Sequence, residues 1–171
     1  MSTNNTDMAT YKKGDFLIDF GQVFKIIRID TVKTSSGTDK LLVFTPYFKT
    51  DNEAEITSSL PESNLDKTTI RKPSSKKDFE YVMSILSDKK VEPEIVDVLT
   101  AKAVLNQNDP TLVAETIRKL YLEKSDQDVK FTSSKKYVYQ MLISRLAEEL
   151  ALINNISLEK AQTKVENKIK K

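Results

Sequence analysis

The sequence predicts an α+β protein in which a small β module precedes an all-helical module. Two observations lead to this prediction. Runs of β-branched and aromatic residues separated by turn residues occupy residues 16–61. Further along the chain, apolar residues recur at the three- and four-residue spacing of amphipathic helices. The pattern changes near residues 72–75, so we expect a frayed tail over 1–10, a β module over 11–73 and a helical module over 74–171.

The β module is expected to contain several short strands at close spacing. Gly21 punctuates the first run, TSSGTD (34–39) predicts a hairpin loop, and Pro61 ends the last run because proline cannot donate a ladder hydrogen bond. Such spacing favours a small twisted barrel or half-barrel. The expected strands are FLIDF (16–20), VFKIIRID (23–30), KLLVFTPYF (40–48) and EAEITSSLP (53–61).

The helical module is expected to contain about five helices, most of which begin at a capping residue. Pro93 suits the first turn of the second helix, whose periodic residues would be Ile95, Val98, Leu99, Lys102 and Leu105. The long fourth helix should bury Val138, Met141, Leu142, Leu146 and Leu150. The other expected starts are Ser75, followed by Asp78; Asp109, followed by Pro110; Thr132 or Ser133; and Ser157.

Composition argues against an enzyme. The chain of 171 residues has no histidine and no cysteine, which excludes disulfides and thiolate zinc sites and removes the commonest general base. With three glycines it offers no phosphate-binding or dinucleotide-binding loop. Carboxylate or lysine catalysis and a Mg²⁺ or Ca²⁺ site stay possible on composition alone, but we expect no catalytic site, no metal, no cofactor and no small-molecule substrate. No run is long and apolar enough for a membrane span, and the N-terminus lacks the apolar core of a secretory signal.

The pair Glu148-Glu149 is the one carboxylate dyad worth weighing as a catalytic site. Neighbouring positions on a helix point about 100° apart, so the two side chains are not expected to converge on one substrate. We expect them to lie on a solvated helix face.

Three stretches carry a resemblance to a known family. The first is YKKGDFLIDFGQVFKIIRID, and the second is LPESNLDKTTIR (60–71). The third comprises DPTLVAETIRKLYLEK and FTSSKKYVYQMLISRLAEELALINNISLEKAQ. In this order, over roughly residues 11–165, they resemble the CarD/CdnL family of bacterial RNA polymerase-binding transcription regulators. The resemblance implies a Tudor-like N-terminal module that docks on the RNA polymerase β subunit, and a helical module that contacts promoter DNA.

The resemblance also implies contact residues for the polymerase. Lys33 takes the place of a basic residue in the hairpin, and Ser59 takes the place of a basic residue just before the Leu-Pro pair. An open sheet edge could pair with a strand of the partner. The stretch KLLVFTPYF is more apolar than one core face needs, so Val43 and Phe44 join the expected polymerase contacts.

For promoter DNA, Lys135 and Lys136 match basic positions of the family and could contact phosphates, although a solvated first helical turn is an equally good reading. Arg118 is a third candidate, and Glu115 offers it an ion pair instead. The family often carries a DNA-wedging tryptophan, whereas this chain has no tryptophan and the acidic stretch VEPEIVDVL at that place. Carboxylates there would repel phosphates. Two functions therefore stay open: a cytoplasmic, nucleoid-associated regulator that acts as a monomer, and a protein-interaction adaptor of the same architecture without DNA binding.

Overall fold

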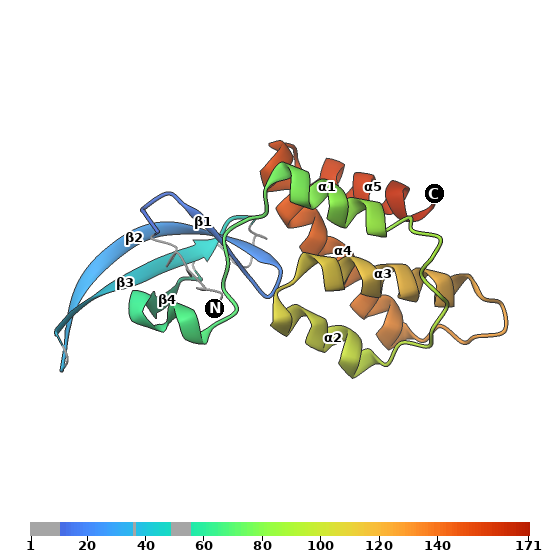
Figure 1. Cartoon of the computed structure of the whole chain (residues 1–171), viewed down its shortest axis with the longest axis horizontal. Coiled ribbons are helices and arrows are strands. Elements are labelled where there is room, and N and C mark those ends of the chain that lie inside the picture. Colours follow the sequence, from blue (N-terminus) through green and yellow to red (C-terminus); the bar gives the residue numbers. More distant parts are fainter. Residues whose placement is uncertain (1–10, 36, 49–55) are drawn as a thin grey trace, which may run out of the picture.

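The computed structural model describes residues 11–35, 37–48 and 56–171. Within these residues the chain is a mixed α+β protein, with a four-stranded antiparallel sheet followed by helices (Figure 1). The expected tail over 1–10 and residues 53–55 of the expected fourth strand lie outside the described residues.

The sheet has the strand order β1-β2-β3-β4. Its two inner strands are longer than expected, because they continue to Thr34 and Gly37 and leave only two residues for the hairpin loop. A tight turn at Phe20-Gly21 joins β1 to β2, and both of its residues have positive φ angles, 49° and 72°. The strands are β1 (Phe16–Asp19), β2 (Gln22–Thr34), β3 (Gly37–Pro46) and β4 (Ser58–Pro61).

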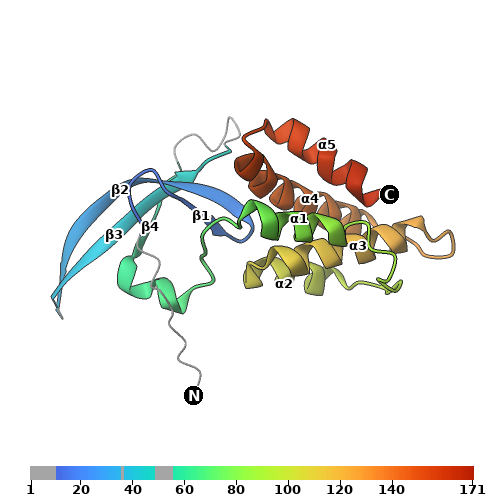
Figure 2. The ribbon, with the colours of Figure 1, turned by 45° about the horizontal axis from the view of Figure 1, so that its top comes forward.

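Of the expected barrel or half-barrel, the closed form is not seen in the described residues, where the sheet is open. The edge strands β1 and β4 have 4 residues each, too few to flank the 13 residues of β2 and the 10 of β3 along their length. Within the described residues, the outer edge of β1 carries a single bridge, between Ile18 and Arg71, and no strand joins β1 to β4. Part of the β2–β3 pair therefore projects as a two-stranded ribbon, which Figures 1 and 2 show reaching away from the helices.

Five α-helices follow the sheet, after a short 3₁₀ helix, η1 (Glu62–Lys67). The capping residues expected for the other four helices, all except the second, are confirmed. In each case the side chain accepts a backbone N–H of the first helical turn. The caps are Ser75, Asp109, Thr132 and Ser157. The helices are α1 (Lys76–Ile85), α2 (Val98–Gln107), α3 (Pro110–Ser125), α4 (Ser133–Asn154) and α5 (Leu158–Ile169).

The second helix begins later than expected. Asp97 caps it by accepting the N–H of Thr100 at 2.9 Å, so Pro93 lies outside the helix. Helix α2 buries Ala101, Val104 and Leu105. Ile95 and Leu99, two of the residues expected to continue the helical period, are 72% and 75% exposed. Of the expected periodic residues, Leu105 is buried and Val98 packs partly buried against the core, whereas Ile95, Leu99 and Lys102 are exposed.

The helical core is continuous around α4 and α3, and the sheet has a smaller core of its own. Of the stripe expected on α4, Val138, Leu142, Leu146 and Leu150 are buried, whereas Met141 is only partly buried. None of the described helices is both long and apolar enough to cross a membrane.

Candidate functional site

A polar junction joins the sheet to the helices. Arg71, which follows η1, donates from Nη1 and Nη2 to both carboxylate oxygens of Glu149 on α4, at 2.8 and 2.6 Å. The backbone N–H and the hydroxyl of Ser74 donate to the same carboxylate, each at 2.8 Å. The Glu149 side chain is only 2% exposed. Four short hydrogen bonds inside the protein stabilise its carboxylate charge in place of water.

Glu148, the neighbour of Glu149, reaches a different part of the sheet. Its Oε2 accepts the backbone N–H of Val23 in β2 at 2.9 Å, and its Oε1 accepts Nη1 of Arg145 at 2.8 Å. The expectation of a solvated face for this pair was therefore wrong, since both residues are buried. The two side chains do diverge, as helix geometry requires, but each divergent carboxylate has a partner at the junction.

Asn108 makes the third group of contacts at the junction, after those of Glu149 and Glu148. It ends α2 in the left-handed conformation, with φ 53°, which asparagine tolerates better than most residues. Its amide nitrogen donates to the carbonyls of Ile18 and Thr69 at 2.7 and 2.8 Å, while its Oδ1 accepts the N–H of Gly21 at 3.0 Å. One side chain thus satisfies three backbone groups of the β module from the end of a helix.

Gly21 shows how closely the sheet and the helical module approach each other. A Cβ at this position would lie 3.1 Å from Cβ of Arg145 and 3.2 Å from a methyl group of Leu105. The β1–β2 turn therefore needs glycine both for its positive φ and for its contact with α4 and α2. With the junction formed, the helices and the sheet are held in one defined relative orientation.

The projecting ribbon offers a free strand edge. Strand β1 pairs only with residues 22–25 of β2, so residues 27–33 have no strand partner on that side within the described part of the chain. Lys33 is exposed near the ribbon tip, and Ser59 is exposed on the edge strand β4. Val43 and Phe44 are 5% and 4% exposed, so their side chains belong to the core and offer no surface to a partner.

The residues expected to contact DNA are not brought together. Arg118 is buried, and it donates to the backbone carbonyls of Asp88 and Ile169 at 3.2 and 3.0 Å rather than to Glu115. Lys135 has a side chain only 12% exposed, and its ammonium pairs with the buried carboxylate of Glu123. Of the three candidates, only Lys136 is exposed.

The other oxygen of Glu123 accepts the backbone N–H of Val96 at 3.1 Å. The Glu123–Lys135 pair therefore connects α3, α4 and the segment that precedes α2. Sequence reasoning missed this role because the two residues are 12 positions apart and lie on different helices. No local pattern indicates such a pair.

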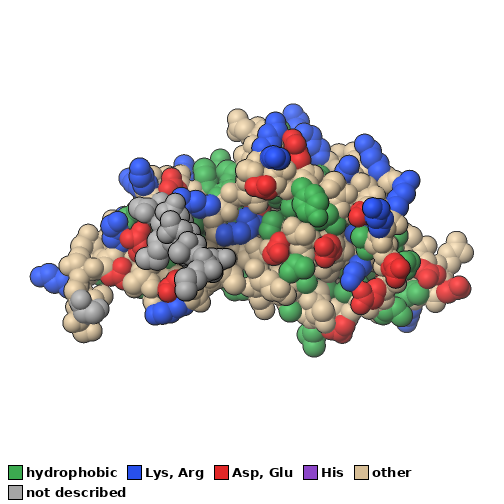
Figure 3. All heavy atoms as spheres, in the orientation of Figure 1, with side chains coloured by type: hydrophobic (Ala, Val, Ile, Leu, Met, Phe, Trp, Pro, Cys, Tyr) green, Lys and Arg blue, Asp and Glu red, His purple; other side chains and the backbone are tan. Residues whose placement is uncertain are grey.

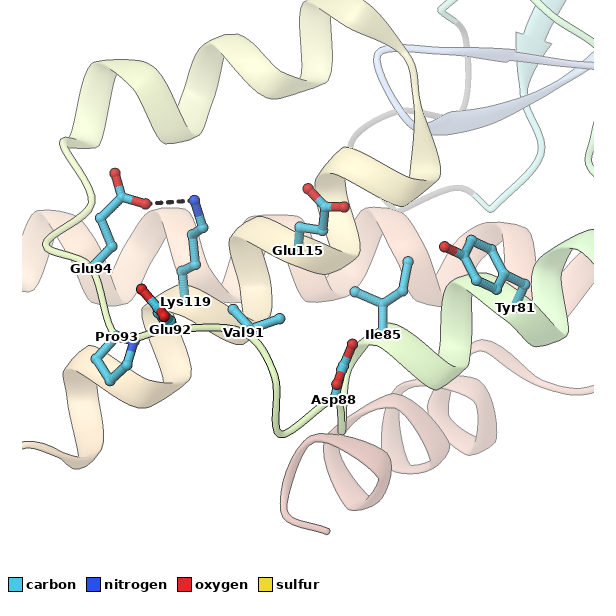
Figure 4. A pocket seen from close by; sticks show the side chains of 9 residues that line it. All are labelled: Tyr81, Ile85, Asp88, Val91, Glu92, Pro93, Glu94, Glu115 and Lys119. Atoms are coloured by element: carbon cyan, nitrogen blue, oxygen red, sulfur yellow. Dashed lines mark hydrogen bonds and ion pairs between the residues drawn. The ribbon is translucent and has the colours of Figure 1, made fainter.

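A hollow of about 510 Å³ lies where the end of α1, the segment before α2 and α3 meet (Figure 4). Among the described residues, four carboxylates line it, from Asp88, Glu92, Glu94 and Glu115, together with a single cation, Lys119. Lys119 is already paired with Glu94 at 2.5 Å. Figure 3 shows acidic and hydrophobic side chains gathered over this side of the helical module.

Comparison of the chain with models of known protein families finds no match, and comparison with curated proteins finds none either. The functional assignment therefore depends on the sequence resemblance and on the geometry described above.

Proposed function

We propose that the chain is a CarD-like transcription regulator of the bacterial cytoplasm that docks, as a monomer, on the RNA polymerase β subunit through its sheet. In this proposal the open sheet corresponds to the Tudor-like module of that family. The observation that carries the proposal is the unpartnered edge of β2 over residues 27–33. An exposed strand edge presents a row of N–H and C=O groups that an extended segment of a partner can pair with.

The geometry of the ribbon supports docking by strand addition. The hairpin closes with Thr34 opposite Gly37, so the hydrogen bonds from β2 to β3 fall on alternate residues. We therefore expect Thr31 and Lys33 to direct their N–H groups away from β3, toward a partner strand. Lys33 adds a positive charge beside that edge. The polar junction holds the helical module in a defined position relative to the sheet, and therefore relative to a partner bound at the β2 edge.

The test is retention of the purified bacterial RNA polymerase β subunit by the immobilised full-length chain. Thr31→Pro removes one outward N–H from the free edge, and Thr31→Ala is its matched control because it retains that N–H. We expect Thr31→Pro to abolish retention and Thr31→Ala to preserve it. Circular dichroism and thermal unfolding of both variants establish that the sheet still forms.

Two results would contradict docking through this edge. One is equal retention of the β subunit by both variants. The other is the absence of retention by the unmodified chain, which would also remove the support for a transcription role.

The adaptor without DNA binding is a second candidate, and specific observations favour it. Arg118 and Lys135 are engaged inside the protein, and the stretch where the family carries its tryptophan contributes carboxylates to the acidic hollow. Titration with a DNA duplex at several salt concentrations separates the two functions. A regulator that contacts phosphates gives an affinity that falls with salt by about one to two ion equivalents, whereas an adaptor gives no measurable affinity.

A further inference from the structure

Among the described residues, the hollow between α1, the 88–97 segment and α3 is lined by more acidic than basic side chains. Its four carboxylates face one lysine, in a chain whose overall net charge is +2. Glu94 is paired with Lys119. The Asp88 carboxylate accepts the backbone N–H of Lys90 at 2.9 Å. Among the described residues, the carboxylates of Glu92 and Glu115 have neither a hydrogen bond nor an ion pair.

Apolar side chains flank the same hollow. Tyr81, which lines it from α1, is 65% exposed. Ile95 follows the lining residue Glu94 directly in the chain, and Leu99 lies in the first turn of α2; these two side chains are 72% and 75% exposed. Large apolar residues beside a concave, partly polar surface are typical of protein–protein contact sites, in which aromatic residues are enriched. An acidic face that contacts only solvent would not require the exposed apolar side chains of Tyr81, Ile95 and Leu99.

We propose that this hollow is a docking site for a basic segment of a partner protein, one that carries lysine or arginine together with apolar side chains. Charge complementarity selects the occupant. Figure 4 shows Glu115 between Tyr81 at one end of the hollow and Glu92 at the other. One cationic side chain of the segment can lie between Glu115 and the ring of Tyr81, as ammonium and guanidinium groups do on aromatic faces, and a second can reach Glu92. The apolar side chains of the segment then cover Ile95 and Leu99.

Other occupants fit this surface less well. A nucleic acid would place phosphates against carboxylates, which is repulsive. A metal ion needs several ligands converging on one point, and the described residues contain no group of three acidic side chains placed to hold one. The site is separate from the β2 edge, so it does not depend on polymerase docking.

The test is fluorescence anisotropy of the full-length chain with a labelled synthetic peptide of lysines and leucines. A peptide with glutamate in place of lysine and a DNA duplex serve as the other probes. The double variant Glu92→Gln/Glu115→Gln removes the two unpaired charges. The matched control Asp66→Asn/Glu159→Gln removes two exposed carboxylates outside the hollow, and so changes the net charge equally.

We expect binding of the lysine peptide that weakens with salt, and a loss of about tenfold in affinity in the hollow variant against less than about twofold in the control. Leu99→Ser should weaken binding by about threefold through its apolar contact. Equal weakening in the hollow and control variants would mean non-specific attraction and would overturn the proposal. Absence of peptide binding, or tighter binding of the glutamate peptide or the duplex, would overturn it as well.

Discussion

Arg71 and Glu149 form a bidentate ion pair between the end of the β module and the C-terminal third of the long helix α4, with N–O distances of 2.8 and 2.6 Å. The pair is asymmetric in exposure, because the Glu149 side chain is 2% exposed and the Arg71 side chain is 25% exposed. Removing the arginine therefore leaves a carboxylate with little access to water, whereas removing the carboxylate leaves a guanidinium that water can still reach.

This asymmetry predicts the result of a substitution pair. Arg71→Ala should lower the free energy of unfolding by about 3 kcal/mol, at the low end for breaking a buried pair because Arg71 is partly exposed. Glu149→Gln should cost less, since the amide can keep a hydrogen bond to the guanidinium. Urea unfolding measures both, and Glu159→Gln on the exposed face of α5 is the control expected to change little. Equal, small effects of both junction variants would contradict the importance of the pair.

Asn108 provides a second test of the junction, because its left-handed backbone conformation and the hydrogen bonds of its side-chain amide can be separated by substitution. Asn108→Gly keeps the left-handed backbone available but removes the hydrogen bonds to Ile18, Gly21 and Thr69. Asn108→Asp keeps the acceptor for Gly21 but loses the donor.

We expect each Asn108 variant to lower the free energy of unfolding by about 1–3 kcal/mol, because buried backbone groups lose their partners. Chemical denaturation gives the values. If Asn108→Gly leaves the free energy of unfolding unchanged, the position requires the left-handed backbone conformation and not the bridging amide.

Lys135 and Lys136 are adjacent in the sequence, but their surroundings in the structure differ. Lys135 pairs with the buried Glu123, whereas Lys136 is exposed. Lys135→Ala should lower the free energy of unfolding by about 3 kcal/mol, because it leaves the Glu123 carboxylate buried and unpaired. Lys136→Ala should change it by less than about 0.5 kcal/mol. Thermal and urea unfolding check both values, and a stable Lys135→Ala would show that the internal pair is dispensable.

Much of the fold was predictable because it depends on local signals. Four of the helix starts follow from a capping side chain and its first turn, which a sequence displays directly. The second helix was placed too early because Pro93 and Asp97 are both acceptable starts, and only tertiary packing chooses between them. The openness of the sheet was not predictable for a similar reason. Closure depends on strand lengths and register across the sheet, not on any one strand.

The junction was the least predictable part. Glu148 and Glu149 look like surface residues of an amphipathic helix, and their partners Val23 and Arg71 are 125 and 78 residues away. Buried carboxylates of this kind are rare, because the cost of removing a charge from water must be met by several hydrogen bonds at once. A single sequence carries no sign that those donors will be in place.

Two buried tyrosines predict that the protein loses stability in alkali. Burial raises the pKa of Tyr139 to about 12, with a further contribution from Tyr121 and Glu166. Burial, helped by the charge of Asp15, raises the pKa of Tyr11 to about 12 as well. In the unfolded chain both hydroxyls ionise near pH 10, so between about pH 10 and 12 the unfolded state releases protons that the folded state keeps. Stability is therefore unaffected by these groups below about pH 10 and falls as the pH rises toward 12.

Urea unfolding measured across this range should show the fall, by up to about 2 kcal/mol for each tyrosine. Tyr139→Phe should remove one of the two contributions and make the protein less sensitive to alkali. Tyr137→Phe, which removes a hydroxyl from a side chain that is 66% exposed on the same helix, should retain the wild-type decline. If Tyr139→Phe declines as steeply as the wild type, the alkaline loss comes from other groups, and the burial of Tyr139 does not govern its ionisation.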